Sequence, residues 1–311
     1  MPAFELTAAE RSLLPTPEDV DFYREHGWFL SAPLFGPAEL AAGMAASDRF
    51  YGGERDRVLP RRPHRSAYWE PEHGDVQRHN DYIAYESDAI RRIFCKPLVA
   101  AVAARLMGTR SVRLWSSTLI YKPPRPDERS NLVPWHTDLH HWPTCTSDNL
   151  VTAFIPLHDC TEEHGTLTVL DGSSRWAELP PQPGDDPTSH FADRPAAALQ
   201  AAVTATAAHN GATVDPVPLR YRAGQVSFHH CRTYHSSGPN TSPAARRVIT
   251  IRFQDEANAW RPAHGPGGEP VAYSHDDLVR RTAAGEPDYR DADFCPVLWE
   301  EPEPAAAAAG A

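Results

Sequence analysis

The chain has 311 residues, 41% of them hydrophobic, and a formal net charge of −11 at pH 7. This length is sufficient for one catalytic domain with a sizeable core, and the acidic balance argues against a nucleic-acid partner, which needs a basic face. No apolar run reaches the length of a membrane-spanning helix, and the first residues lack a basic and apolar signal sequence. The five cysteines are widely spaced without a CxxC pair, which indicates reduced thiols. We therefore expect a cytoplasmic monomer or homodimer that contacts neither nucleic acid nor membrane.

Helix signals dominate the N-terminal part of the chain. Thr16 precedes a proline and two acidic residues, which is the pattern of a helix start, and Gly27 marks the stop. Residues 17–26 are therefore expected to form a helix. A short strand is predicted at 28–31 and a second helix at 37–50.

Two further segments complete this N-terminal part. Residues 51–87 are polar and rich in Arg, His and Pro, which predicts a long loop region. Residues 88–107 have apolar positions at helical spacing, and Pro97 is expected to interrupt that helix or to begin a new one. We therefore expect residues 17–110 to be mainly helical, with loops.

The hydrophobic period changes at about residue 111, where SVRLWSSTLIYK has the composition of a strand. Further short strands, separated by Gly, Pro and Asn turns, are predicted at 151–157, 166–170, 225–230 and 247–253. Short strands that follow a helical part predict an α+β chain with a β-sandwich or barrel core over 111–255.

Two segments fall outside this strand pattern. Residues 173–223 form a long Pro- and Ala-rich insertion, and such excursions in compact domains are usually lids or binding loops. Residues 262–311 form a C-terminal extension whose end, EPEPAAAAAGA, has low complexity and is expected to be disordered. We expect the whole of 1–311 to be a single catalytic domain.

A metal-binding pattern stands at the end of a predicted strand. His136 and Asp138 are two residues apart, so in an extended segment their side chains point to the same side. A second histidine from a distant strand would complete a set of two imidazoles and one carboxylate, and His235 is the candidate. This ligand set leaves coordination positions open, which suits Fe(II) oxygen chemistry. Spacing alone leaves open the alternative that both histidines are ordinary hydrogen-bonded residues.

The His-x-Asp spacing also occurs elsewhere in the chain. The three other matches are His73 with Asp75, His79 with Asp81, and His275 with Asp277. All three are expected to lie in polar regions outside the strand-rich core. We therefore expect these pairs not to bind the metal.

Several motifs occur in a fixed order around these residues. They are YKPP at 121–124, WHTD at 135–138, HGTLTVLDGSSR at 164–175, GQVSFHH at 224–230 and HSSGPN at 235–240, followed by Arg246. In this order and spacing the sequence resembles the phytanoyl-CoA dioxygenase family of Fe(II)/2-oxoglutarate oxygenases. The resemblance implies a double-stranded β-helix (jelly-roll) core with the N-terminal helices packed on it. It also implies Fe(II), 2-oxoglutarate as cosubstrate, and O₂.

The resemblance assigns roles to individual residues. His136, Asp138 and His235 would bind iron and form the catalytic centre. Arg246 would hold the distal carboxylate of 2-oxoglutarate, helped by Ser237. An arginine suits this position because its planar guanidinium binds a carboxylate through two parallel hydrogen bonds.

Four further residues are expected near the bound molecules. Lys122 and Thr118 would lie beside the cosubstrate, although a lysine in a surface turn is the alternative for Lys122. Trp142 and His140 would contact the substrate, and a core tryptophan is the alternative for Trp142.

The expected activity is oxidation of an unactivated C–H bond of a small molecule, most simply hydroxylation, with release of succinate and CO₂. A biosynthetic intermediate of a bacterial natural product is the expected substrate class. One alternative is an acyl-CoA hydroxylase of the same family, with Arg61, Arg62, His64 and Arg65 as a basic entrance for the nucleotide phosphates. The other is a jelly-roll metal-binding protein that is not an oxygenase, which would not need Arg246 or Ser237.

Overall fold

The computed structural model describes residues 4–63, 67–124, 132–179, 194–265 and 267–302. Its N-terminal helices are α1 (Ala8–Arg11), α2 (Pro17–His26), α3 (Pro37–Tyr51), α4 (Ile83–Glu86), α5 (Asp88–Phe94) and α6 (Pro97–Met107). Thr16 caps α2 by accepting a hydrogen bond from the amide of Asp19, and Gly27 ends it in a left-handed conformation at φ 77°. The predicted break at Pro97 is confirmed, because this proline is the first residue of α6.

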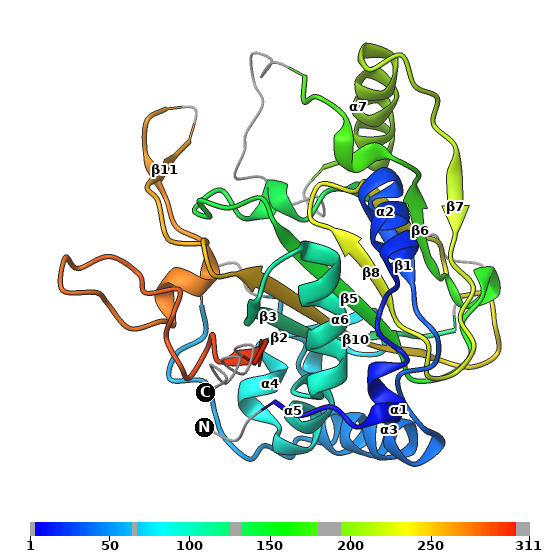
Figure 1. Cartoon of the computed structure of the whole chain (residues 1–311), viewed down its shortest axis with the longest axis vertical. Helices are drawn as coiled ribbons and strands as arrows, with labels where there is room; N and C mark the ends of the chain where they lie inside the picture. The colour runs from blue at the N-terminus through cyan, green and yellow to red at the C-terminus, as the bar shows by residue number, and fades with distance from the viewer. Residues whose placement is uncertain (1–3, 64–66, 125–131, 180–193, 266, 303–311) are drawn as a thin grey trace, which may run out of the picture.

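The strands form two antiparallel sheets that face each other, the jelly-roll architecture expected from the resemblance (Figure 1). The major sheet has the order β1 (Trp28–Leu30), β8 (Ser227–His230), β5 (Leu150–Pro156), β10 (Arg246–Asp255), β3 (Ser111–Lys122) and β13 (Val297–Glu300), with β2 (Arg78–Asp81) also paired to β3. The minor sheet has the order β4 (Val133–His136), β9 (His235–Ser237), β6 (Leu167–Leu170) and β7 (Pro216–Pro218). A short hairpin of β11 (Ala263–His264) and β12 (Pro270–Val271) projects at the left of Figure 1.

The two faces of the major sheet have different chemistry because side chains alternate along a strand. The outer face carries apolar residues such as Leu119, Ile251 and Phe253, and these pack in one cluster with the helices. Most of α6 is buried in that cluster. The inner face carries polar residues such as Thr118 and Arg252, which line a cavity between the sheets. The helices and the outer face of the major sheet therefore form the main core, and the polar side chains of the inner face line the cavity.

Two smaller apolar clusters lie toward opposite ends of the inner face. One surrounds Phe154 and Val248, toward the end of β10 where Arg246 begins the strand. The other surrounds Trp115 and includes Tyr289 and other residues of the C-terminal segment. The polar cavity lies between these clusters.

The structure corrects the expectation that 51–87 is a loop region. It contains β2 and α4, and β2 pairs with the C-terminal part of β3. The sequence did not reveal β2 because RHND has neither strand composition nor alternation, so only its pairing with β3 makes it a strand.

The insertion and the extension also contain regular structure. Residues 173–223 include α7 (Ala196–His209) and β7, while 262–311 includes β13, which extends the major sheet. The end of the extension, predicted to be disordered, lies outside the described residues from 303 onward.

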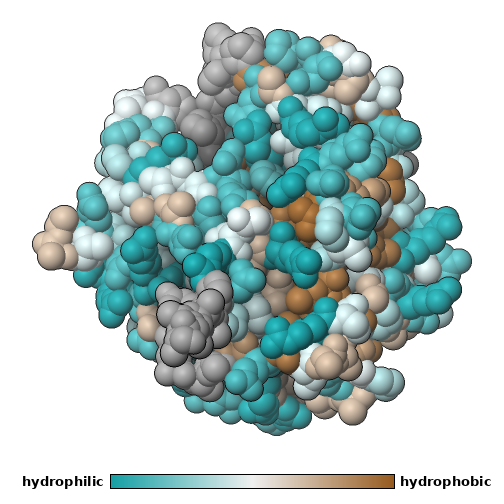
Figure 2. All heavy atoms as spheres, viewed as in Figure 1, coloured by the Kyte–Doolittle hydropathy of each residue, from teal (hydrophilic) through white to brown (hydrophobic). Residues whose placement is uncertain are grey.

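The surface drawn in Figure 2 is mostly hydrophilic, and its hydrophobic residues gather in a strip near the centre. Among the described residues, no helix combines the length and the apolar character that a membrane crossing requires.

Candidate metal centre

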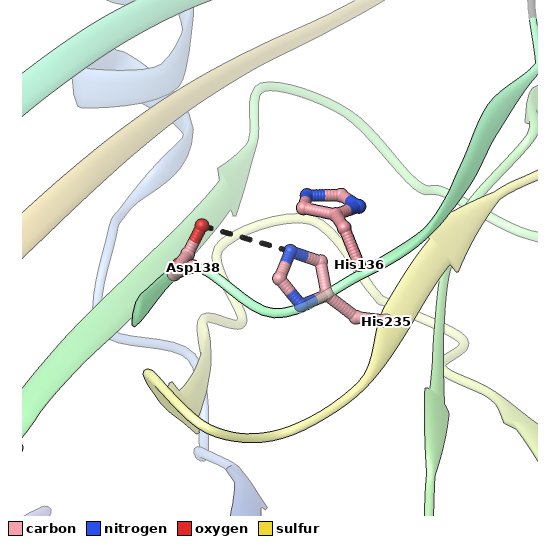
Figure 3. A group of neighbouring side chains, drawn as sticks. All are labelled: His136, Asp138 and His235. Atoms are coloured by element: carbon pink, nitrogen blue, oxygen red, sulfur yellow. Dashed lines mark ion pairs between the residues drawn. The ribbon is translucent and has the colours of Figure 1, made fainter. Parts of the chain in front are cut away.

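Three side chains from different parts of the chain meet at one point in the cavity (Figure 3). His136 ends β4, Asp138 follows it, and His235 begins β9, which pairs with β4 so that the two histidines stand opposite each other. One potential ligand atom from each of the three lies within 4.8 Å of the others. The His235 Nε2 and Asp138 Oδ1 atoms are 3.8 Å apart. The predicted convergence of these three residues is confirmed.

The backbone orients both imidazoles. The Nδ1 of His136 lies 2.8 Å from the carbonyl oxygen of Pro134, and the Nδ1 of His235 lies 2.9 Å from that of Thr233. A ring that donates from Nδ1 to a carbonyl keeps its proton there and leaves Nε2 as a lone-pair donor. Both rings are therefore prepared to coordinate a metal through Nε2.

The protonation states also suit a metal. Burial lowers the pKa of His235 to about 4, so this ring is neutral near pH 7. Burial favours the neutral acid at Asp138, but the neighbouring His229 and the positive charge of Arg252 outweigh that effect, so its pKa lies well below the usual range. The group thus offers two neutral nitrogens and one carboxylate, a donor set that fits Fe(II).

Two residues that the sequence reasoning left without a role hold Asp138 in place. The hydroxyl of Thr152 on β5 donates to Asp138 Oδ2 at 2.5 Å, and His229 Nε2 on β8 is 3.4 Å from the same oxygen. With Oδ2 occupied in this way, Oδ1 faces His235 and is the oxygen available to a metal. His229 belongs to the GQVSFHH motif, which could have identified it, whereas a lone buried threonine gives no signal.

The other His-x-Asp pairs do not join a metal group among the residues described. His275 is fully buried and packs against Trp115, with its Nε2 2.9 Å from the thiol of Cys295, so it is a core residue. The expectation that His79 and Asp81 lie outside the strand-rich core was wrong, because both are on β2 and line the cavity.

A pair of buried cations lies where β10 begins opposite the end of β3, and one of them, Arg246, lines the same cavity. Arg246 and Lys122 are opposite each other in register, and both side chains are almost completely buried. The hydroxyl of Ser237 accepts from Arg246 Nη1 at 2.9 Å and from Lys122 Nζ at 2.6 Å. The hydroxyl proton is in turn donated to the carbonyl oxygen of Gly165 at 3.0 Å. Three residues expected at the cosubstrate therefore form one hydrogen-bonded group.

This cation pair fits a dicarboxylate. Burial lowers the pKa of both Arg246 and Lys122, and the charge of Arg246 lowers the pKa of Lys122 further. No carboxylate of the described residues pairs with either cation, and the buried Nε of Arg246 has no hydrogen-bond partner among them. Buried charges require a partner of opposite sign. The distal carboxylate of 2-oxoglutarate would supply this partner.

Gly165 supports this cation site through a close backbone approach. Its φ is +64°, and a Cβ there would lie 2.3 Å from the carbonyl oxygen of Gly238. We expect Gly165→Ala to destabilise the fold by about 1–3 kcal/mol, measured by denaturant unfolding, and to weaken 2-oxoglutarate binding. Gly211→Ala is the matched control, because Gly211 has the same φ but open space around the position of a Cβ. Equal destabilisation by the two substitutions would mean that the contact with Gly238 is unimportant.

The cavity has a volume of about 170 Å³ and extends past the metal group, away from Arg246. Trp142 lines it there and is 2% exposed in the adjoining core cluster, and its contact with the substrate stays a prediction. Thr118 lines the same far part and bonds to Asp81 and Arg252 instead of to the cosubstrate cations. His140 is exposed and lines a neighbouring cavity on the other side of His136.

The insertion lies over that neighbouring cavity. Arg194, Leu199 and Ala202 line it together with His136 and His140, and α7 packs on β4. None of the described residues of the insertion lines the main cavity, and residues 180–193 lie outside the described chain. The lid-like role expected for 173–223 therefore stays a prediction.

Comparison with known proteins agrees with this geometry. The family model for phytanoyl-CoA dioxygenase (PhyH) matches residues 23–248. The chain is 28% identical over 273 residues to the peroxisomal phytanoyl-CoA dioxygenase of Bos taurus, covering 85% of this chain and 76% of that protein. It is 27% identical over 176 residues to a probable alpha-ketoglutarate-dependent hypophosphite dioxygenase of Stutzerimonas stutzeri, covering 56% of this chain and only 55% of that protein.

A solved structure extends the likeness to nearly the whole chain. The epimerase SnoN, crystallised in complex with Fe³⁺, alpha ketoglutarate and nogalamycin RO, has a TM-score of 0.64 and 26% sequence identity. The match covers 94% of this chain and 99% of that one. The chain therefore belongs to the phytanoyl-CoA dioxygenase family and is an enzyme that depends on iron, 2-oxoglutarate and O₂.

Proposed function

We propose that this enzyme hydroxylates an unactivated C–H bond of a compact small molecule, most simply an intermediate in the biosynthesis of a bacterial natural product. The observation that carries the proposal is the presence of two sites in one cavity. The group of His136, Asp138 and His235 can hold Fe(II), and the buried cations Arg246 and Lys122 can hold 2-oxoglutarate beside it.

The proposed overall reaction is balanced. Substrate C–H, 2-oxoglutarate and O₂ give substrate C–OH, succinate and CO₂, so one oxygen atom enters the alcohol and the other enters succinate. Iron with its bound 2-oxoglutarate supplies O₂ activation coupled to oxidative decarboxylation.

The residues of this chain would fix the positions of the reactants. Arg246 would grip the distal carboxylate of 2-oxoglutarate, while Lys122 and Ser237 neutralise and align it. Trp142 and the surrounding cavity wall would exclude bulk water from the reacting C–H bond.

The size and lining of the cavity support a compact substrate. Its volume of about 170 Å³ is below the range of pockets that enclose drug-sized ligands. The acyl-CoA alternative needs a basic entrance, yet Arg62 already pairs with Glu70 and stacks on Tyr68 at 4.4 Å. His64 and Arg65, the other members of that entrance, lie outside the described residues. SnoN, an epimerase bound to nogalamycin RO, supports a natural-product role and also shows that relatives use different reaction outcomes.

The test is product analysis under ¹⁸O₂ with a panel of candidate substrates. We expect a substrate that stimulates succinate release to gain one labelled oxygen, in near-equal amounts with labelled succinate. The label in succinate reports 2-oxoglutarate turnover independently of what happens to the substrate. A product that carries no added oxygen atom, formed together with labelled succinate, would refute hydroxylation in favour of epimerisation, desaturation or ring formation.

A further inference from the structure

A second arginine of β10 points into the cavity beyond the metal group. Arg252 Nη1 donates to the hydroxyl of Thr118 at 2.8 Å, and the hydroxyl of Ser116 is 3.5 Å from the same nitrogen. No carboxylate of the described chain lies within ion-pair distance of Arg252. The hydroxyls of Thr118 and Ser116 therefore hold one edge of this guanidinium, and the side chain of Arg252 lines the cavity.

A carboxylate lies one hydroxyl away from this arginine. Thr118 Oγ1 accepts from Arg252 and donates to Asp81 Oδ1 at 2.7 Å, and the other Asp81 oxygen accepts from the Ala67 amide at 2.9 Å. Asp81 also lines the cavity, and it pairs with no cation of the described residues. The hydrogen bonds through Thr118 thus hold an anion, Asp81, and a cation, Arg252, close together on the cavity wall.

The position of Arg252 separates it from the cosubstrate site. Arg252 lies six positions after Arg246 on β10, which places their Cα atoms about 20 Å apart at the rise of a strand. Arg252 stands opposite Thr152 on β5, the residue whose hydroxyl holds Asp138. The metal group therefore lies between the two arginines, with 2-oxoglutarate expected on the Arg246 side.

The charges of the cavity can now be assigned. The carboxylate of Asp138 would pair with the iron, and the cations Arg246 and Lys122 would pair with the dicarboxylate. The charges left on the wall are one cation, Arg252, and one anion, Asp81. A ligand with a single charge would leave either Arg252 or Asp81 without an oppositely charged partner, whereas a zwitterion offers a partner to each.

The geometry points to Arg252 and Asp81 as the substrate-anchoring pair, which binds a compact amino acid with its carboxylate at Arg252 and its ammonium at Asp81. This inference rests on the proposed function and specifies its substrate class. Tyr273 and Ser274 line the same part of the cavity from the C-terminal segment, and Trp142 adds an aromatic wall. Burial raises the pKa of Tyr273, so its phenol stays neutral and does not disturb the charge match. The apolar part of an amino acid would then face the metal group.

The experiment uses the anaerobic enzyme with Fe(II) and 2-oxoglutarate, whose charge-transfer absorption reports the cosubstrate complex. The probes are proteinogenic, cyclic and N-methylated L-amino acids, each also as its amide and, where the nitrogen carries a hydrogen, its N-acetyl derivative. We expect at least one free amino acid to perturb the absorption and to stimulate succinate release once O₂ is admitted. Its amide and its N-acetyl derivative should bind at least about 30-fold more weakly, since each lacks one charge.

The variants assign each charge to one residue. Arg252→Gln should remove the discrimination between the amino acid and its amide, and Asp81→Asn that between the amino acid and its N-acetyl derivative. Both variants should form the 2-oxoglutarate complex at wild-type concentrations. Arg247→Gln is the control, because Arg247 is on the same strand but faces outward and pairs with Asp48. It should keep both discriminations.

The outcomes separate this inference from the proposed function. If the absorption forms but no free amino acid perturbs it, the amino-acid assignment is wrong while the cofactor chemistry stands. If Arg252→Gln raises the 2-oxoglutarate or iron requirement and leaves discrimination intact, Arg252 serves the cosubstrate or Asp138 and the inference is overturned. If the absorption does not form at all in the wild type, the proposed function itself fails.

Discussion

Replacement of Asp138 by alanine is expected to abolish turnover and to weaken iron binding. The residue supplies the one carboxylate of a three-ligand site, and its loss leaves two neutral imidazoles for a divalent cation. His136→Ala and His235→Ala should have the same effect, since each removes a third of the ligands. The measurements are iron content after dialysis, Fe(II) titration by the charge-transfer absorption, and succinate release.

His73→Ala is the control for these ligand variants. His73 is also followed by an aspartate two residues later, but its ring Nδ1 accepts from the Glu70 amide in the exposed helical turn η1 (Pro71–His73). Its replacement should leave iron content and turnover unchanged. Full activity in any one of the three ligand variants would show that the metal is held elsewhere.

Replacement of Arg246 by leucine is expected to raise the 2-oxoglutarate requirement by on the order of 100-fold or more. Breaking a buried charge pair by removing one partner costs about 3–5 kcal/mol, and each 1.4 kcal/mol is about tenfold in affinity. Arg246→Lys should rescue only partly, because an ammonium lacks the planar fork that binds a carboxylate through two hydrogen bonds. The measurement is the KM for 2-oxoglutarate together with titration of the charge-transfer absorption.

Arg247→Leu tests the register of this assignment. Arg247 is the next residue along β10, so its side chain points to the opposite face, where it pairs with Asp48. Its replacement should leave 2-oxoglutarate binding unchanged. An unaltered KM in Arg246→Leu, or a raised one in Arg247→Leu, would contradict the proposed role of Arg246.

The metal group could be predicted from the sequence because its chemistry leaves a local signature. His136 and Asp138 are close in the chain, and the ordered motifs fixed His235 and Arg246 at long range. The strands of the core could be predicted from their β-branched and aromatic composition, whereas their jelly-roll arrangement was implied by the resemblance to the family. These features depend on residues whose type is dictated by the reaction.

The substrate side of the cavity could not be predicted in this way. Asp81 is on a strand without strand composition, Tyr273 follows the core in a segment that reads as an extension, and Thr152 is one of many threonines. Their proximity is created only when β2 pairs with β3 and the C-terminal segment packs beside it. Thr118 was expected at the cosubstrate, but it lies four positions before Lys122 on β3, beside Asp81 and Arg252.

The buried cation pair has a consequence for how long the protein survives when its cosubstrate is scarce. Burial and the charge of Arg246 both disfavour the charged form of Lys122, so binding of 2-oxoglutarate at the proposed site would stabilise the native state. A ligand that binds only the native state stabilises it by about 2.7 kcal/mol at 100 times its Kd. Because degradation follows the population of opened molecules, the enzyme should be cleared fastest when 2-oxoglutarate is depleted. The proposed anion site would thus couple the abundance of this protein to the supply of 2-oxoglutarate.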